Sequence, residues 1–124
     1  MLPKDAKIMV VDDTKIIRFA MKKYLKILGY ENIVEAVDGN DAVKKHLEEK
    51  PSLVFMDVVM PGLTGDKALQ QIRLQDKKTP VIMLTSVSDE SVMNVCEEAG
   101  IAGYIIKPIT ADDGPEVLRK YLNI

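Results

Sequence analysis

The 124-residue chain has only one cysteine, Cys96, and one histidine, His46. A single cysteine excludes an internal disulfide and a cysteine-based metal cluster. No apolar run approaches the ~18 residues that a membrane span requires, and the segment Met1–Asp5 lacks the apolar core of a secretory signal peptide. We therefore predict a cytoplasmic protein with no membrane partner.

Strong charge of either sign is also missing, because the formal net charge at pH 7 is only −2. A chain with this balance has no global basic field to attract nucleic acid. Apolar residues make up 47% of the chain and charged residues 29%, a composition typical of a folded globular domain. We expect a single domain over residues 1–124, which either stands alone or is excised from a longer protein.

Four short apolar runs end in polar residues, and the run Leu53–Met56 before Asp57 is the clearest. A short run of this kind, bounded by turn residues, is typical of a strand that is buried on both faces of a parallel sheet. Parallel strands end at the same edge of their sheet, so the residues that follow the runs should gather there. In chain order these residues are Asp12 and Asp13, Asp57, Thr85, and Lys107.

Strand and helix patterns alternate five times along the chain, which predicts an α/β fold with a parallel sheet covered by helices on both faces. The predicted strands are Lys7–Val11, Ile33–Ala36, Leu53–Asp57, Val81–Leu84 and Gly103–Ile106. The predicted helices are Thr14–Leu28, Asn40–Glu48, Gly65–Leu74, Asp89–Ala99 and Pro115–Leu122.

Asp12, Asp13 and Asp57 would place three carboxylates in one cleft, where their mutual repulsion has to be offset. A hard divalent cation such as Mg²⁺ prefers oxygen ligands of this kind, whereas zinc favours cysteine and histidine. With the positive charge of Lys107 and the hydroxyl of Thr85, the site suits a phosphoryl group. Asp57 could then serve as a nucleophile that forms an aspartyl phosphate.

Taken together and in this order, four motifs resemble a response-regulator receiver domain of the chemotaxis-regulator (CheY-like) type, over nearly the full chain. The motifs are Asp12-Asp13, Asp57–Gly65, Thr85-Ser86 and Lys107-Pro108. The resemblance implies a flavodoxin-like receiver fold, a doubly wound five-stranded parallel sheet with the strand order 2-1-3-4-5 and five helices. It also implies a cis peptide bond between the lysine and proline of the last motif.

The resemblance assigns a role to each residue of the site. Asp57 would be the phosphoacceptor and would take its phosphoryl group from a phosphohistidine of a histidine kinase or a histidine phosphotransfer protein. Thr85 and Lys107 would contact the phosphoryl oxygens. The ligands of Mg²⁺ would come from Asp12, Asp13, Asp57 and the backbone carbonyl of Val59.

Signalling would depend on a switch pair, in which Thr85 moves toward the phosphoryl group and Tyr104 turns inward. The protein would be a stand-alone response regulator in chemotaxis, motility or a phosphorelay, and not an ordinary enzyme. Its target would bind the face formed by the fourth predicted helix, the fifth strand and the fifth helix. The resting protein would be a monomer, and dimerisation on phosphorylation stays open.

Two apolar residues depart from the family pattern. Val59 and Val87 lie two residues after Asp57 and Thr85, where receiver domains often carry polar groups that influence the attack of water on the aspartyl phosphate. Neither valine can orient a water molecule, so the sequence predicts slow self-dephosphorylation.

Charge is unevenly distributed between two predicted helices. The helix over 14–28 carries five basic residues and no acid, whereas the helix over 89–99 carries four acids. These are either solvated faces or two docking surfaces, and a basic first helix would favour an acidic phosphodonor. His46 lies among charged residues and is predicted on the surface, while Cys96 is predicted in the core.

Three other functions are compatible with parts of the sequence, but one feature of the chain speaks against each. A Mg²⁺-dependent phosphohydrolase of the haloacid-dehalogenase type would need a second carboxylate two residues after Asp57, where Val59 stands. A flavodoxin-like cofactor binder would need a Gly-rich or hydroxyl-rich loop after the first strand, where acids stand instead. An inert pseudo-receiver that acts only as a binding module would not need the complete set of acids, threonine and lysine.

Overall fold

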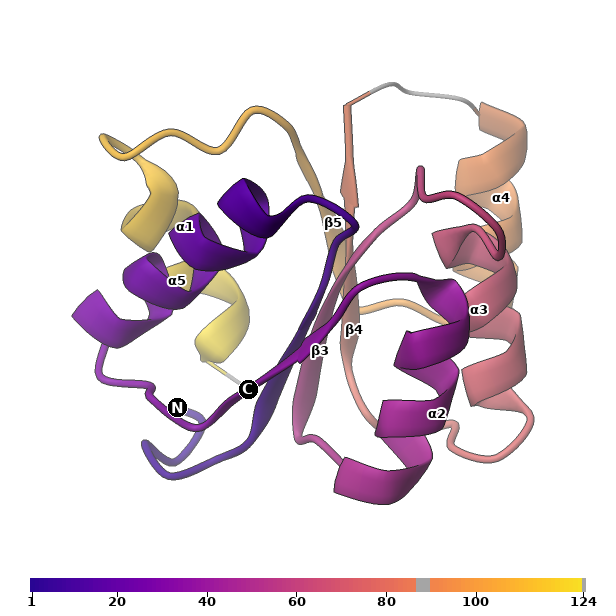
Figure 1. The fold of residues 1–124 in the computed structure, drawn as a ribbon, viewed down its shortest axis with the longest axis horizontal. Coiled ribbons are helices and arrows are strands. Elements are labelled where there is room, and N and C mark those ends of the chain that lie inside the picture. The colour runs from indigo at the N-terminus through magenta and orange to yellow at the C-terminus, as the bar shows by residue number, and fades with distance from the viewer. Residues whose placement is uncertain (87–89, 124) are drawn as a thin grey trace.

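A computed structural model describes residues 1–86 and 90–123, in which five strands alternate with five helices (Figure 1). The strands are β1 (Ile8–Val11), β2 (Ile33–Ala36), β3 (Leu53–Asp57), β4 (Val81–Thr85) and β5 (Gly103–Ile106). The helices are α1 (Lys15–Ile27), α2 (Gly39–Glu49), α3 (Gly65–Arg73), α4 (Glu90–Ala99) and α5 (Gly114–Leu122).

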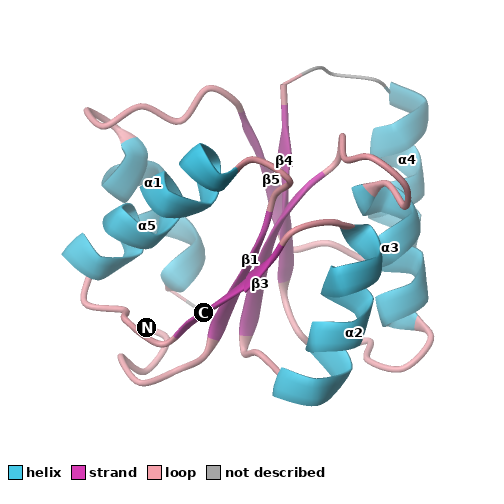
Figure 2. Cartoon of the chain, viewed as in Figure 1, coloured by secondary structure: helices cyan, strands magenta, loops and turns pink. Residues whose placement is uncertain are grey.

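All strand pairs are parallel, and the order across the sheet is β2-β1-β3-β4-β5. Helices α1 and α5 cover one face of this sheet, and α2, α3 and α4 cover the other (Figures 1 and 2). The fold class, the strand order and the five helices expected from the resemblance are therefore confirmed. None of the described helices is long and apolar enough to cross a membrane.

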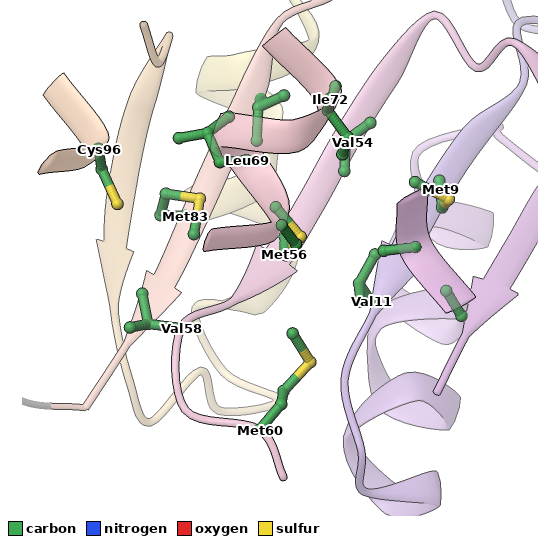
Figure 3. Packing of buried hydrophobic residues seen from close by; sticks show 14 residues of the cluster. Met9, Val11, Val54, Met56, Val58, Met60, Leu69, Ile72, Met83 and Cys96 are labelled. Atoms are coloured by element: carbon green, nitrogen blue, oxygen red, sulfur yellow. The ribbon is translucent and has the colours of Figure 1, made fainter. Parts of the chain in front are cut away.

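Each face of the sheet has its own apolar core, because neighbouring residues of a strand point to opposite faces. Ile8 and Val10 of β1 join the cluster beneath α1 and α5. Met9 and Val11 join the cluster beneath α2, α3 and α4. Figure 3 shows this second cluster, in which Met83 lies beside Cys96 and the methionines Met56 and Met9 lie farther along the sheet. Cys96 is fully buried, as predicted.

The ends of the described elements agree with the sequence prediction to within one residue. Gly29 follows α1 with a φ of +98°, a left-handed conformation that glycine adopts easily and that ends the helix. Helix α5 begins at Gly114, one residue before the predicted Pro115. The predicted start of the fourth helix, Asp89, lies outside the described residues.

His46 is not on the surface, so the prediction from its charged sequence neighbours is wrong. Its side chain is only 5% exposed and lies on the face of α2 that also buries Ala42, four residues earlier. The Nε2 atom lies 2.9 Å from Oδ2 of Asp76. Asp76 also accepts hydrogen bonds from the Thr79 hydroxyl and from the backbone amides of Lys78 and Thr79. The pair therefore ties α2 to the turn that follows α3.

We expect Asp76→Ala to lower the free energy of unfolding at pH 7 by about 2 kcal/mol, because it leaves partly buried donors without their acceptor. Burial alone would raise the pKa of Asp76, but its hydrogen bonds hold that pKa well below the usual range. A carboxyl with a lowered pKa stabilises the fold above its unfolded pKa of about 4 and loses this contribution as the pH falls through its folded pKa. The cost of the substitution should therefore shrink between pH 7 and about pH 3.

Urea titrations at both pH values test this prediction. The matched control is Glu48→Ala, which removes an exposed acid near His46 on α2 and should change the free energy of unfolding by less than about 0.5 kcal/mol. If Asp76→Ala lowers the free energy of unfolding equally at both pH values, the ionisation of Asp76 does not contribute to the stability of the fold.

Candidate functional site

The polar ends of four strands meet at one edge of the sheet, at the top in Figure 1. The register of β1 against β3 brings Asp12 and Asp57 side by side at this edge. The register of β4 against β5 sets Thr85 beside the residue that precedes Lys107. The convergence predicted from the sequence is therefore confirmed for these strand ends.

Lys107 bridges two of the carboxylates. Its Nζ atom lies 3.0 Å from Oδ2 of Asp12 and 3.2 Å from Oδ2 of Asp57. The two acids are buried, with side chains 1% and 8% exposed. Buried charges are tolerated only where close partners replace the lost water, and Lys107 is such a partner. The Lys107–Pro108 peptide bond is cis, as the resemblance implies.

Asp13 completes a group of three acids. Carboxylate oxygens of Asp12, Asp13 and Asp57 all lie within 4.8 Å of one another, and Asp13 is the exposed member. One ammonium cannot neutralise three carboxylates, so the site keeps an excess of negative charge. Its donors are oxygen atoms, and this set fits a hard divalent cation such as Mg²⁺ better than zinc.

Asp12 is held in place from helix α1. Its Oδ1 accepts a hydrogen bond of 2.8 Å from the backbone amide of Thr14. Its backbone carbonyl accepts another, also of 2.8 Å, from Nη1 of Arg18. These contacts fix the residue at both ends and leave Oδ2 to receive the hydrogen bond from Lys107.

The loop after β3 presents its backbone to the site. Val58 and Met60 are buried at the edge of the cluster in Figure 3, while Val59 between them is 66% exposed. The Val59 amide donates to the Asp57 carboxylate. Gly65 closes the loop, because its amide donates to the Val58 carbonyl and a Cβ there would lie 2.0 Å from the Asp57 carbonyl oxygen. Only glycine fits at this position of the motif.

Burial and nearby charges shift the pKa values of Asp57 and Lys107. Burial raises the pKa of Asp57, and the attraction of Lys107 opposes this rise only in part. Burial alone would lower the pKa of Lys107, but its hydrogen bond to Asp12 and the charge of Asp57 raise that pKa above its ordinary value. Lys107 is therefore a permanent cation at the site.

Thr85 and Tyr104, the expected switch pair, line one groove between α4 and the end of the sheet. This groove has a volume of about 460 Å³, and Glu90 and Glu97 also line it. Thr85 is buried, whereas Tyr104 is 45% exposed. The other residue predicted to influence dephosphorylation, Val87, lies outside the described residues.

Arg18, which holds the Asp12 backbone, takes part in ion pairs that the sequence did not reveal. Arg18 and Lys22 of α1 both pair with Glu35 of β2, each at 3.1 Å. Burial alone would raise the pKa of Glu35, but the hydrogen bonds from these two cations lower it. The first helix is thus partly neutralised by an acid from another element, which its own sequence could not show.

Known proteins are similar to this chain in sequence and in fold. A family model of the response regulator receiver domain matches residues 8–119. The chain is 36% identical to the chemotaxis protein CheY of Bacillus subtilis over 117 residues, which cover 94% of this chain and 98% of that protein.

Solved structures agree with this result. The chemotaxis protein CheY4 of Vibrio cholerae has a TM-score of 0.83 and 32% identity, with 95% of this chain and 96% of that chain covered. A receiver domain of the sensor histidine kinase PA1611 of Pseudomonas aeruginosa, which holds a magnesium ion in its active site cleft, has a TM-score of 0.81 and 25% identity. That match covers 97% of this chain and 99% of the other.

We expect Asp57→Asn to raise the free energy of unfolding at pH 7, without added metal, by about 1 kcal/mol. A carboxyl with a raised pKa binds its proton more tightly in the folded state, so its ionisation destabilises the fold at neutral pH. This penalty fades as the pH falls, and the advantage of the variant should be lost near pH 4, about the pKa of an unfolded aspartate.

Thermal and urea unfolding at pH 7 and about pH 4 measure this difference. Asp13→Asn is the matched control, because it removes an exposed charge of the same group and should stabilise the fold less. An Asp57→Asn protein that is less stable than the wild type at pH 7 would show that the Lys107 pair outweighs the cost of burial.

Proposed function

The chain belongs to the response regulator receiver domain family, and on that basis we propose that it is a phosphorylatable response regulator of a two-component phosphorelay. The observation that carries this proposal is the position of Lys107 between the buried acids Asp12 and Asp57. An inert domain would have no reason to keep such a costly cluster of charges. We further propose that the protein acts on no separate substrate and is not an ordinary enzyme.

In the proposed reaction, a carboxylate oxygen of Asp57 attacks the phosphorus atom of a phosphohistidine on a histidine kinase or phosphotransfer protein. The bond between phosphorus and the imidazole nitrogen breaks, and the leaving nitrogen keeps the electron pair. Lys107 and the Thr85 hydroxyl would each hold a phosphoryl oxygen, and their positive charge and hydrogen bond stabilise the charge that develops there. The product is an aspartyl phosphate on Asp57.

Asp12, Asp13, Asp57 and the backbone carbonyl of Val59 would hold Mg²⁺ at this site. The magnesium ion named for the receiver domain of PA1611 supports this assignment, as does the oxygen-only donor set here. When bound, the cation supplies positive charge that offsets the phosphoryl oxygens and the acids. Without it, the acids of this chain would repel the incoming phosphodonor.

Phosphorylation would shift an equilibrium between two conformations, as in other phosphorylation switches. Thr85 would move toward the phosphoryl group, and Tyr104 would turn from its half-exposed position into the space between α4 and the sheet. The changed face of α4, β5 and α5 would then bind a downstream protein. The similarity to chemotaxis regulators favours a chemotaxis or motility partner.

We expect a single phosphoryl adduct on the intact protein after incubation with Mg²⁺ and a small acyl phosphate such as acetyl phosphate. The adduct should require Mg²⁺ and should be absent from Asp57→Asn, because the attacking carboxylate is gone. Lys107→Met should lower the rate of adduct formation by about tenfold or more, since it removes the cation at the phosphoryl oxygens.

Intact-mass measurements over time follow this reaction, and Lys67→Met, an exposed lysine on α3, controls for the loss of a positive charge elsewhere. A wild-type protein that stays folded and gains no adduct would favour the inert binding module. Continued turnover of a phosphate ester would instead favour the phosphohydrolase.

Dephosphorylation should be slow, because the exposed Val59 side chain beside the site cannot orient a water molecule. We expect Val59→Asn to speed the loss of the phosphoryl group by about tenfold, since its amide can hydrogen-bond the attacking water. Mass spectra taken after removal of the phosphodonor give both rates, and Val59→Ala should lose phosphate as slowly as the wild type. Loss from the wild type within seconds would contradict the prediction.

A further inference from the structure

The peptide unit between Asp12 and Asp13 joins two of the three acids of the site. Asp12 is buried, whereas Asp13 is exposed, and its carboxylate forms no ion pair within residues 1–86 and 90–123. The position of Asp13 therefore depends on its backbone. A peptide unit is planar, so the direction of the Asp12 carbonyl fixes where the nitrogen and Cα of Asp13 lie. The group that holds this carbonyl thus determines the place of the third acid.

Arg18 of α1 holds the Asp12 carbonyl. It lies in the first turn of the helix, which begins at the same edge of the sheet as the site (Figure 1). Its Nη1 atom donates to the carbonyl oxygen over 2.8 Å. The Arg18 side chain is only 11% exposed, so little water competes for this bond. On the other side, the Asp12 amide donates to the Ala36 carbonyl of β2 over 3.1 Å.

Arg18 is itself fixed by an acid of the edge strand β2. Its Nε atom donates to Oε1 of Glu35, and Nζ of Lys22 lies 3.1 Å from the other oxygen of the same carboxylate. The backbone carbonyl of Glu35 accepts a hydrogen bond of 2.6 Å from Lys45 of α2, on the opposite face of the sheet. A guanidinium presents its donors in a rigid fork, so the bond to Glu35 aims Nη1 at the Asp12 carbonyl.

We propose that Arg18, oriented by Glu35, is a positioning residue that prepares the Asp12–Asp13 peptide to bind a divalent cation. This inference rests on the proposed function, because it concerns the same magnesium site. Arg18 would not contact the cation. It would keep the acids in the close group that the structure shows, against their mutual repulsion. Removal of a residue that orients metal ligands in this way lowers metal affinity by roughly 10- to 100-fold.

Charge and position predict opposite effects when Arg18 is removed. A cation near three carboxylates repels a second cation, so the loss of its charge alone would strengthen the binding of Mg²⁺. The loss of its hydrogen bond would free the peptide, and ordering it again would weaken the binding. Lys22 is the matched control, because it pairs with the same acid but forms no hydrogen bond to Asp12 within the described part of the chain.

A titration of Mg²⁺ into the full chain, labelled with ¹⁵N and kept at constant ionic strength, gives the dissociation constant from the amide shifts of the site. Arg18→Met should raise this constant about tenfold, whereas Lys22→Met should leave it unchanged or lower it. Arg18→Lys keeps the charge but loses the fork, so it should also raise the constant, by about threefold. Glu35→Gln should add little to the effect of Arg18→Met, because Glu35 acts through Arg18.

Two further measurements separate positioning from a general loss of stability. Urea titrations give the free energy of unfolding, which a purely structural role would lower without changing the Mg²⁺ affinity of the folded protein. The Asp13 amide belongs to the same peptide unit as the Asp12 carbonyl. In ¹⁵N relaxation without Mg²⁺, its order parameter should therefore be lower in Arg18→Met than in the wild type or Lys22→Met. Arg18→Lys carries both measurements if Arg18→Met does not fold.

Two results would overturn this inference alone. The wild type could bind Mg²⁺ while Arg18→Met binds it as tightly or more tightly, which would leave Arg18 no role in positioning. The order parameter of the Asp13 amide could also stay unchanged in both variants of Arg18. A wild type that binds no Mg²⁺ at millimolar concentrations would instead refute the proposed metal site, and this inference with it.

Discussion

The charge of Lys107 is the constraint on which the rest of the site depends. Two acids, Asp12 and Asp57, are buried at the ends of neighbouring strands, and each would repel the other without a cation between them. Lys107 reaches both from the end of β5, although β5 and β1 are not neighbours in the sheet. The contacts of Lys107 therefore form only when β1, β3 and β5 are assembled in one sheet.

The charges of the site do not cancel, because one lysine faces three carboxylates. This excess of negative charge prepares the site for a cation. The surplus negative charge of Asp13 and the raised pKa of Asp57 leave a site that gains stability when a cation or a proton arrives. The surrounding scaffold does not yield to the repulsion, because both faces of the sheet are packed and the loop after β3 is anchored by Val58 and Met60. The repulsion among the three carboxylates is thus confined to one edge of a well-packed sheet.

The sequence was sufficient for the fold and the polar cluster, and the reason is geometric. Buried parallel strands are apolar throughout, so the first polar residue after each run marks both the strand end and the sheet edge. The same argument could not find the partners of Glu35, or the burial of His46. Those depend on which helix faces pack together, and the charged neighbours of His46 hide a contact to Asp76 thirty residues away.

Helix α1 supports the site with its first turn and carries exposed cations in its later turns. Its first turn binds Asp12 through Arg18, and its last turns carry Lys23 and Lys26. The helix has 13 residues, which corresponds to a length of about 20 Å, while charges in physiological salt are screened within about 8 Å. A phosphoryl group on Asp57 would therefore alter the field around Lys107 but hardly that at the far end of α1. A partner that contacts Tyr104, in the groove that Thr85 also lines, would instead sense phosphorylation.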